Sequence, residues 1–137
     1  MIQRQQSLWL ILSTISAFLT YKLPFFSGVR SEKGMTQTAI IDGASNFFLL
    51  LLTGAIIILS LVTIFMFKDR SLQIRLSFLG IGLSILLLVL YFLEIKGLSG
   101  SISISAIFVF AILFGFIMAC INIRKDQKLI KSLDKLR

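Results

Sequence analysis

Four long apolar runs separated by short polar segments make up most of the chain. Their length and composition predict four helices, at about residues 7–26, 46–67, 76–95 and 102–123. A helix of ~22 residues spans ~33 Å, which is enough to cross the hydrocarbon layer of a bilayer. The pattern therefore predicts an all-α fold in one domain over residues 1–137, a polytopic membrane protein built as an antiparallel bundle of four transmembrane helices.

The polar segments between the runs are short. Residues 27–45 are rich in Gly, Ser and Thr and are expected to form a loop, in which Met35–Ile41 has modest strand propensity. Residues 68–75 are expected to form a tight polar turn, and residues 97–101 a Gly/Ser turn. Neither glycine nor proline interrupts residues 119–137, so the fourth helix is expected to continue into the charged end of the chain as one rod.

Composition and charge agree with a membrane location. Of the 137 residues, 57% are hydrophobic and 15% are charged, whereas soluble domains carry ~25% charged residues. With the N-terminus inside, ten Lys and Arg residues lie on the inner side and four on the outer side. The positive-inside rule then predicts that both termini are cytoplasmic. The net charge of +8 is thus a topology signal, and no nucleic-acid partner is expected.

The sequence offers little catalytic or metal-binding chemistry. It contains no histidine, and Cys120 is its single cysteine, placed in an apolar run. The loop acids Glu32 and Asp42 lie far apart in sequence and belong to no recognised motif. The apolar runs carry ionisable side chains only at their ends, whereas proton relays and ion-coupled transporters need them at depth. We expect no catalytic residue, no metal, no cofactor and no enzymatic activity.

Small residues recur along three of the predicted helices. They lie at Ala111, Gly115 and Ala119 on the fourth, at Gly80 and Ser84 on the third, and at Ser13 and Ala17 on the first. Such spacing lets helix backbones approach closely within a membrane. Two interpretations stay open: packing among the helices of this chain, or docking of a helix from another protein, for which the stripe on the fourth helix is the best candidate.

The tail, residues 124–137, reads RKDQKLIKSLDKLR and predicts a basic amphipathic helix that extends the fourth span. One face holds the apolar residues Leu129, Ile130, Leu133 and Leu136, and the opposite face holds Arg124, Lys128, Lys131 and Lys135. The tail is expected to dock on a cytoplasmic partner. The alternative is a solvated tail that orients the protein and contacts anionic lipid incidentally.

Asp126 departs from this division of the tail. It falls on the apolar side, close to the point where the fourth helix leaves the membrane. We expect it to form an ion pair with Arg70 or Arg75 of the inner turn.

The two ends of the chain resemble those of a known family. The opening Met1-Ile2-Gln3-Arg4-Gln5 runs directly into a helix, and the tail contains an Arg124-Lys125-Asp126 step followed by KLIKSLDKLR. These motifs, together with the length and the helix count, resemble the small four-helix inner-membrane proteins of Bacteroidota catalogued as domain-of-unknown-function family 4293. The resemblance covers the whole chain. The resemblance implies a multi-pass topology and a location in the bacterial inner membrane. It implies no activity and no site residue.

The expected function is non-enzymatic. We expect an accessory or scaffold subunit of a larger membrane protein complex, in contact with membrane lipids and other membrane subunits. Small-residue helix faces and the cytoplasmic tail are the expected docking surfaces. The alternative is a small transporter or a lipid-handling membrane protein.

Overall fold

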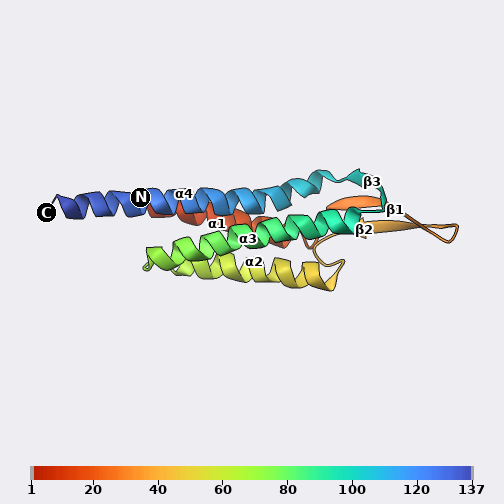
Figure 1. The fold of residues 1–137 in the computed structure, drawn as a ribbon, viewed down its shortest axis with the longest axis horizontal. Helices are drawn as coiled ribbons and strands as arrows, with labels where there is room; N and C mark the ends of the chain where they lie inside the picture. The colour runs from red at the N-terminus through yellow and green to blue at the C-terminus, as the bar shows by residue number, and fades with distance from the viewer. Residues whose placement is uncertain (1, 137) are drawn as a thin grey trace.

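The computed structural model describes residues 2–136, with side chains from Gln5 onward. Met1 and Arg137 lie outside it, as does the side chain of Arg4, so these parts of the end motifs are not described. The elements in chain order are α1 (Ile2–Leu19), β1 (Phe26–Glu32), β2 (Met35–Ile41), α2 (Phe47–Phe65), α3 (Arg70–Ile95), β3 (Ser99–Ile102), a 3-10 turn (Ile104–Ala106) and α4 (Ile107–Lys135). The helices lie side by side in an elongated bundle, with the strands at one end (Figure 1).

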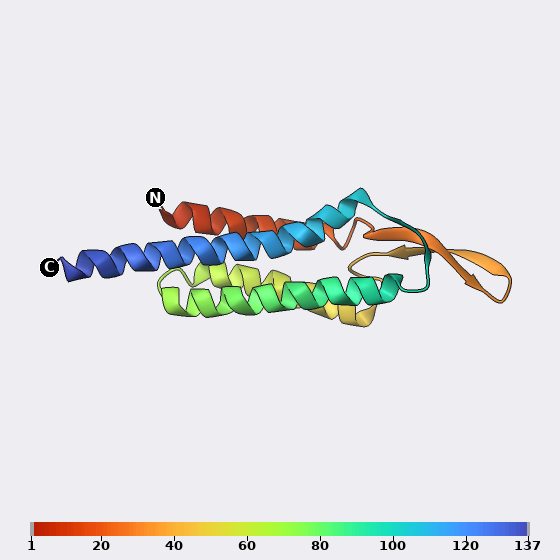
Figure 2. The ribbon, with the colours of Figure 1, turned by 45° about the horizontal axis from the view of Figure 1, so that its top comes forward.

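Both ends of the described chain lie at the other end of the bundle, which we call the termini end. Figure 2 shows the start of α1 and the turn between α2 and α3 at this end, and α4 running beyond both. The end that carries the strands is called the sheet end.

Three helices of the described chain are long and apolar enough to cross a membrane: α2, α3 and the segment Ile104–Lys135 that contains α4. The first helix, α1, is not among them, because glutamine and arginine occupy its first two turns. The structure therefore has the four helices that the sequence predicts, three of them with the character of a membrane span.

The buried positions of the bundle combine large apolar residues such as Leu10, Ile56 and Phe116 with small and polar ones, while many other large apolar side chains face outward. On α3 the buried residues alternate at spacings of four and three: Gln73, Ser77, Gly80, Ser84, Leu87 and Tyr91. On α1 an exposed stripe consists of Leu8, Ile11, Leu12, Ile15 and Phe18. The 4-3 spacing is that of helices packed nearly parallel, as in four-helix bundles. Outward-facing apolar stripes suit a lipid solvent.

The sheet has three antiparallel strands in the order β2-β1-β3. A two-residue turn joins β1 to β2, and Lys33 and Gly34 both have positive φ there, at 50° and 82°, as tight hairpin turns require. Gly28 of β1 pairs with Gly100 of β3, and a Cβ on Gly100 would meet the Ser27 carbonyl oxygen. The glycine pair therefore permits the close approach of these two strands.

The sheet is held on the bundle by aromatic packing. Phe25, just before β1, stacks on Tyr91 of α3 with ring centroids 4.3 Å apart. The Phe25 amide donates to the Ile41 carbonyl at 2.7 Å, and its carbonyl accepts from the Ser103 amide at 2.9 Å. The backbone N–H and carbonyl of Phe25 are thus both hydrogen-bonded to residues from distant parts of the chain.

Several predicted boundaries are wrong, for identifiable reasons. The first helix spans Ile2–Leu19 rather than residues 7–26, because Phe26 pairs with Ile41 and Ile102 in the sheet. The loop predicted at residues 27–45 is mostly a β-hairpin. The turn predicted at residues 68–75 is shorter, since α3 already begins at Arg70. The residues predicted to begin the fourth helix at about 102 belong instead to β3 and the 3-10 turn.

Candidate functional site

Charged and polar side chains from three elements meet at the termini end. Nη2 of Arg70, the first residue of α3, lies 3.2 Å from Oδ2 of Asp126 on α4. Gln6 of α1 donates through Nε2 to the same carboxylate oxygen at 3.5 Å and to the Asn122 carbonyl at 3.3 Å. Asp126 thus joins α1, α3 and α4 at one point.

The ion pair between Arg70 and Asp126 is largely shielded from solvent. The exposed fraction of the side chain is 24% for Arg70 and 10% for Asp126. A carboxylate in this environment needs partners, because burying an unpaired charge is costly. The sequence offered Arg70 and Arg75 as alternatives, and the structure brings Arg70 to Asp126 while Arg75 is exposed on α3.

A second contact joins α3 to α4 nearer the sheet. The guanidinium carbon of Arg124 lies 4.7 Å from the centroid of the Phe78 ring, within the range of a cation–π interaction. Together with the ion pair of Arg70, this contact fixes the orientation of α4 where it leaves the bundle.

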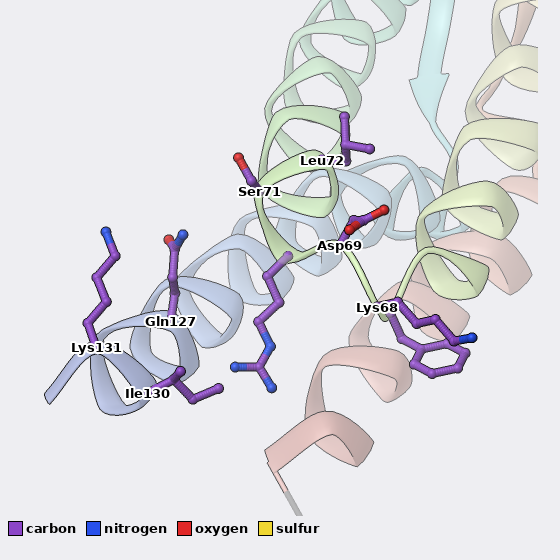
Figure 3. A pocket seen from close by; sticks show the side chains of 9 residues that line it. Lys68, Asp69, Ser71, Leu72, Gln127, Ile130 and Lys131 are labelled. Carbon is purple, nitrogen blue, oxygen red and sulfur yellow. The ribbon is translucent and has the colours of Figure 1, made fainter. Parts of the chain in front are cut away.

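Two open clefts flank the exit of α4. The turn cleft, of about 790 Å³, lies between the α2–α3 turn and the tail and is lined by Phe67, Lys68, Asp69, Arg70, Ser71, Leu72, Gln127, Ile130 and Lys131 (Figure 3). The tail groove, of about 510 Å³, is lined by Ile121, Arg124, Lys125, Gln127, Lys128 and Lys131. They share Gln127 and Lys131 and form one basic surface around the helix.

The tail itself is helical, since α4 continues unbroken to Lys135. Its leucines are largely exposed, at 50% for Leu129, 62% for Leu133 and 84% for Leu136. The four predicted basic residues of the opposite face, Arg124, Lys128, Lys131 and Lys135, are exposed as well. The apolar side of the tail is therefore left largely uncovered by the described part of the chain.

The leucines continue the line along which α4 packs on α1. A Cβ on Gly115 would meet Ser13 and the Trp9 carbonyl of α1, and Gln6 contacts Asn122 and Asp126 further along. From Gly115 the positions Ala119, Asn122, Asp126, Leu129, Leu133 and Leu136 follow at spacings of four and three. This spacing keeps one face of a helix toward a straight neighbour, so the tail presents the same packing face beyond the reach of α1.

The small-residue positions are used within the bundle. Ser13 donates to the Ile112 carbonyl of α4 at 3.1 Å, and Gly115 packs on Ser13. A Cβ on Gly80 of α3 would meet the Phe116 ring of α4, and Ser84 donates to the Gly80 carbonyl at 2.7 Å. Ala17 and Ala119 are fully buried, and Ala111 is half-buried. The faces at Gly115 and Gly80 are therefore occupied by helices of this chain.

The loop acids Glu32 and Asp42 do not converge. Glu32 pairs with Met35 at the tip of the hairpin, while Asp42 follows Ile41, which pairs with Phe26 at its base. Among the described residues, no group of three or more His, Cys, Asp or Glu side chains is arranged to hold a metal ion.

The sequence did not single out several residues of the termini end. Gln6 lies seven residues before Ser13, and this spacing places both on one helix face. The contact of Gln6 with Asp126 is therefore predictable from its position on the same helix face as Ser13. The positions of Lys68 and Phe78 depend on where α3 begins and how it packs on α4, which the local pattern does not determine.

The apolar outward faces and the three span-like helices define a helical membrane protein. The chain belongs to the DUF4293 family, a domain of unknown function, whose sequence model matches residues 2–136. No curated protein and no solved structure matches it.

Proposed function

We propose that this protein is a non-enzymatic subunit of a larger inner-membrane complex, which docks on its partner through the tail of α4. In this proposal the chain crosses the membrane four times, with both termini in the cytoplasm. The partner is a helix whose apolar residues meet the leucines of the tail and whose acidic residues meet its lysines.

Assigning α1 as the fourth span is supported by its surface. Its exposed stripe, from Leu8 to Phe18, is built of large apolar side chains, while its buried side carries Leu10 and Ala17 together with the polar residues Gln6, Ser13 and Ser16. An aqueous surface would favour the reverse arrangement. The polar first turns of α1 then lie at headgroup level, beside the charged residues of the turn and of α4.

The orientation is supported by the charge at the two ends of the bundle. At the termini end the described basic residues are Lys68, Arg70, Arg75, Arg124, Lys125, Lys128, Lys131 and Lys135. Beyond the helices at the sheet end they are Lys22, Arg30, Lys33 and Lys96. The excess favours a cytoplasmic termini end by the positive-inside rule.

The exposed leucine line is the observation that carries the docking proposal. With 29 residues, α4 is ~44 Å long, which exceeds the ~30 Å of a bilayer core. Because the helix is continuous, the tail projects from the membrane instead of lying on its surface, and Leu133 and Leu136 lie away from lipid. Apolar side chains in this position favour burial against another protein.

Substitution of the leucines tests the proposal. The variant L129Q/L133Q/L136Q keeps residues of high helix propensity but removes the apolar face. We expect it to insert normally and to lose its partner during purification in mild detergent. The matched variant L129M/L133M/L136M keeps an apolar face and is expected to retain the partner. A complex of unchanged composition and yield with the glutamine variant would contradict the proposal.

A small transporter or a lipid-handling protein is the second candidate. The lipid-handling version is favoured by the two basic clefts, which lie where the apolar helices end. A transport role needs a polar path through the bundle. The Thr14 and Ser60 hydroxyls, 2.7 Å apart between α1 and α2, are a candidate point on such a path.

A further inference from the structure

The turn cleft has a mixed lining that matches one class of ligand. Lys68, Arg70 and Lys131 supply positive charge, and Asp69 supplies the single opposing charge among its described lining residues. Phe67, Leu72 and Ile130 supply apolar surface, and Ser71 and Gln127 supply neutral hydrogen-bonding groups. A ligand that fills it must carry negative charge beside an apolar part.

The arginine of the cleft is held in place. Its Nη2 is fixed by Asp126, at 3.2 Å, while its guanidinium has further N–H donors for a second acceptor. A positioned guanidinium favours a phosphate group, whose oxygens accept hydrogen bonds in matching geometry. The first turn of α3 adds the partial positive charge of a helix N-terminus.

The location of the turn cleft favours a phospholipid over a free phosphate compound. Phe65 and Phe67 at the end of α2 and Leu72 at the start of α3 are exposed, directly beside the charged lining. In a membrane-spanning bundle this boundary between apolar and charged residues lies at headgroup level. A phospholipid brings a phosphate and an acyl region to that same level, which a free anion does not.

We propose that the turn cleft binds an anionic phospholipid, with its phosphate at Arg70, with Lys68 and Lys131 supplying positive charge from the two sides of the cleft, and with its glycerol and first methylenes against Phe67 and Leu72 (Figure 3). The inference rests on the membrane assignment and is independent of partner docking by the tail. The tail groove, with Arg124, Lys125 and Lys128 on the other side of Lys131, extends the positive field toward a second anionic group.

Native mass spectrometry of the full-length protein, released from detergent with defined lipids, tests the site. We expect phosphatidylglycerol to be retained in preference to phosphatidylcholine. The variant K68Q/K131Q should bind phosphatidylglycerol at least ~10-fold more weakly, since each lysine near an anionic lipid contributes substantially to its attraction. The charge-matched variant K33Q/K96Q, at the sheet end, should bind as the unchanged protein does.

Four outcomes would overturn the inference. They are equal retention of phosphatidylcholine, equal loss of binding in the two lysine variants, displacement of the lipid by millimolar inorganic phosphate, and undiminished binding by K68Q/K131Q. A thermal melt of each variant verifies that it is folded. The L129Q/L133Q/L136Q protein should retain phosphatidylglycerol, so that failure of the docking proposal and failure of the lipid site are distinguished.

Discussion

The guanidinium of Arg70 lies 3.2 Å from the carboxylate of Asp126 and thereby joins the first residue of α3 to the last buried residue of α4. The same carboxylate oxygen accepts from Gln6 of α1. Three helices are thus connected through one acidic side chain, at the end of the bundle where the tail emerges.

The ion pair is expected to stabilise the bundle measurably. D126N keeps the shape of the side chain but leaves the half-buried Arg70 without its counter-charge, at an expected loss of ~1–2 kcal/mol. Reversible unfolding in detergent, combined with R70Q in a double-mutant cycle, measures the coupling. R75Q, at an exposed arginine of the same helix, should change stability by less than ~0.5 kcal/mol. A coupling energy near zero would show that the contact contributes no net stability.

Two glycine-to-alanine changes on long helices should have opposite signs. At Gly115 the new Cβ meets Ser13 and the Trp9 carbonyl, so α1 and α4 must move apart. We expect G115A to cost ~1–3 kcal/mol by overpacking. At Gly82 of α3 nothing lies within 4 Å of the added Cβ, so G82A should gain up to ~1 kcal/mol from helix propensity. The midpoint of thermal unfolding reports both changes, and a neutral G115A would disprove the close contact.

The substitution G100V is expected to disrupt the pairing of β3 with β1. The valine side chain would collide with the backbone of Ser27 and Gly28, whereas S101V, one residue further, enlarges a side chain at an exposed position. We predict faster hydrogen exchange of the β1 and β3 amides in G100V and little change in S101V. The helices should keep their protection in both variants. Unchanged exchange of β1 in G100V would contradict the pairing.

Membrane orientation can be measured with single cysteines in a C120A background. K33C at the hairpin tip should react with a membrane-impermeant maleimide in intact cells, after any outer membrane has been permeabilised. S132C in the tail should react only once the inner membrane is opened. The same reactivity at both positions would mean that an even number of segments crosses the membrane between them, so that α2, α3 and α4 would not all be spans.

The periodicity of the chain predicts the helices but not the sheet. Each apolar run is a local feature, and the continuity of α4 follows from the lack of glycine and proline after Ala119. The pairing of β1 with β3 joins Phe26 to Ile102, 76 positions apart in the printed sequence, and depends on the bundle bringing these segments together. The strands of the hairpin are short and mostly exposed, so their pattern resembles a loop.

The candidate site was partly predictable for a similar reason. Helix phase places Asp126 on the inward side of α4, and its closeness to the membrane exit narrows the partners to Arg70 and Arg75. The choice between them depends on α3 beginning at Arg70, six residues before the predicted start at about 76. The contribution of Gln6 and the shape of the turn cleft depend on the placement of three helices relative to each other, which a local pattern does not contain.

Because β1 lies between β2 and β3, the two ends of the bundle are held together by different kinds of contact. At the sheet end, backbone hydrogen bonds tie the segment after α1 to the segment before α4, and these helices cannot part without breaking a ladder. At the termini end, the described contacts joining α4 to the α2–α3 hairpin are side-chain contacts such as those of Arg70 and Arg124. The connection between α4 and the α2–α3 hairpin therefore depends on side chains beside the turn cleft, whereas α1 and α4 are joined at the sheet end through the backbone.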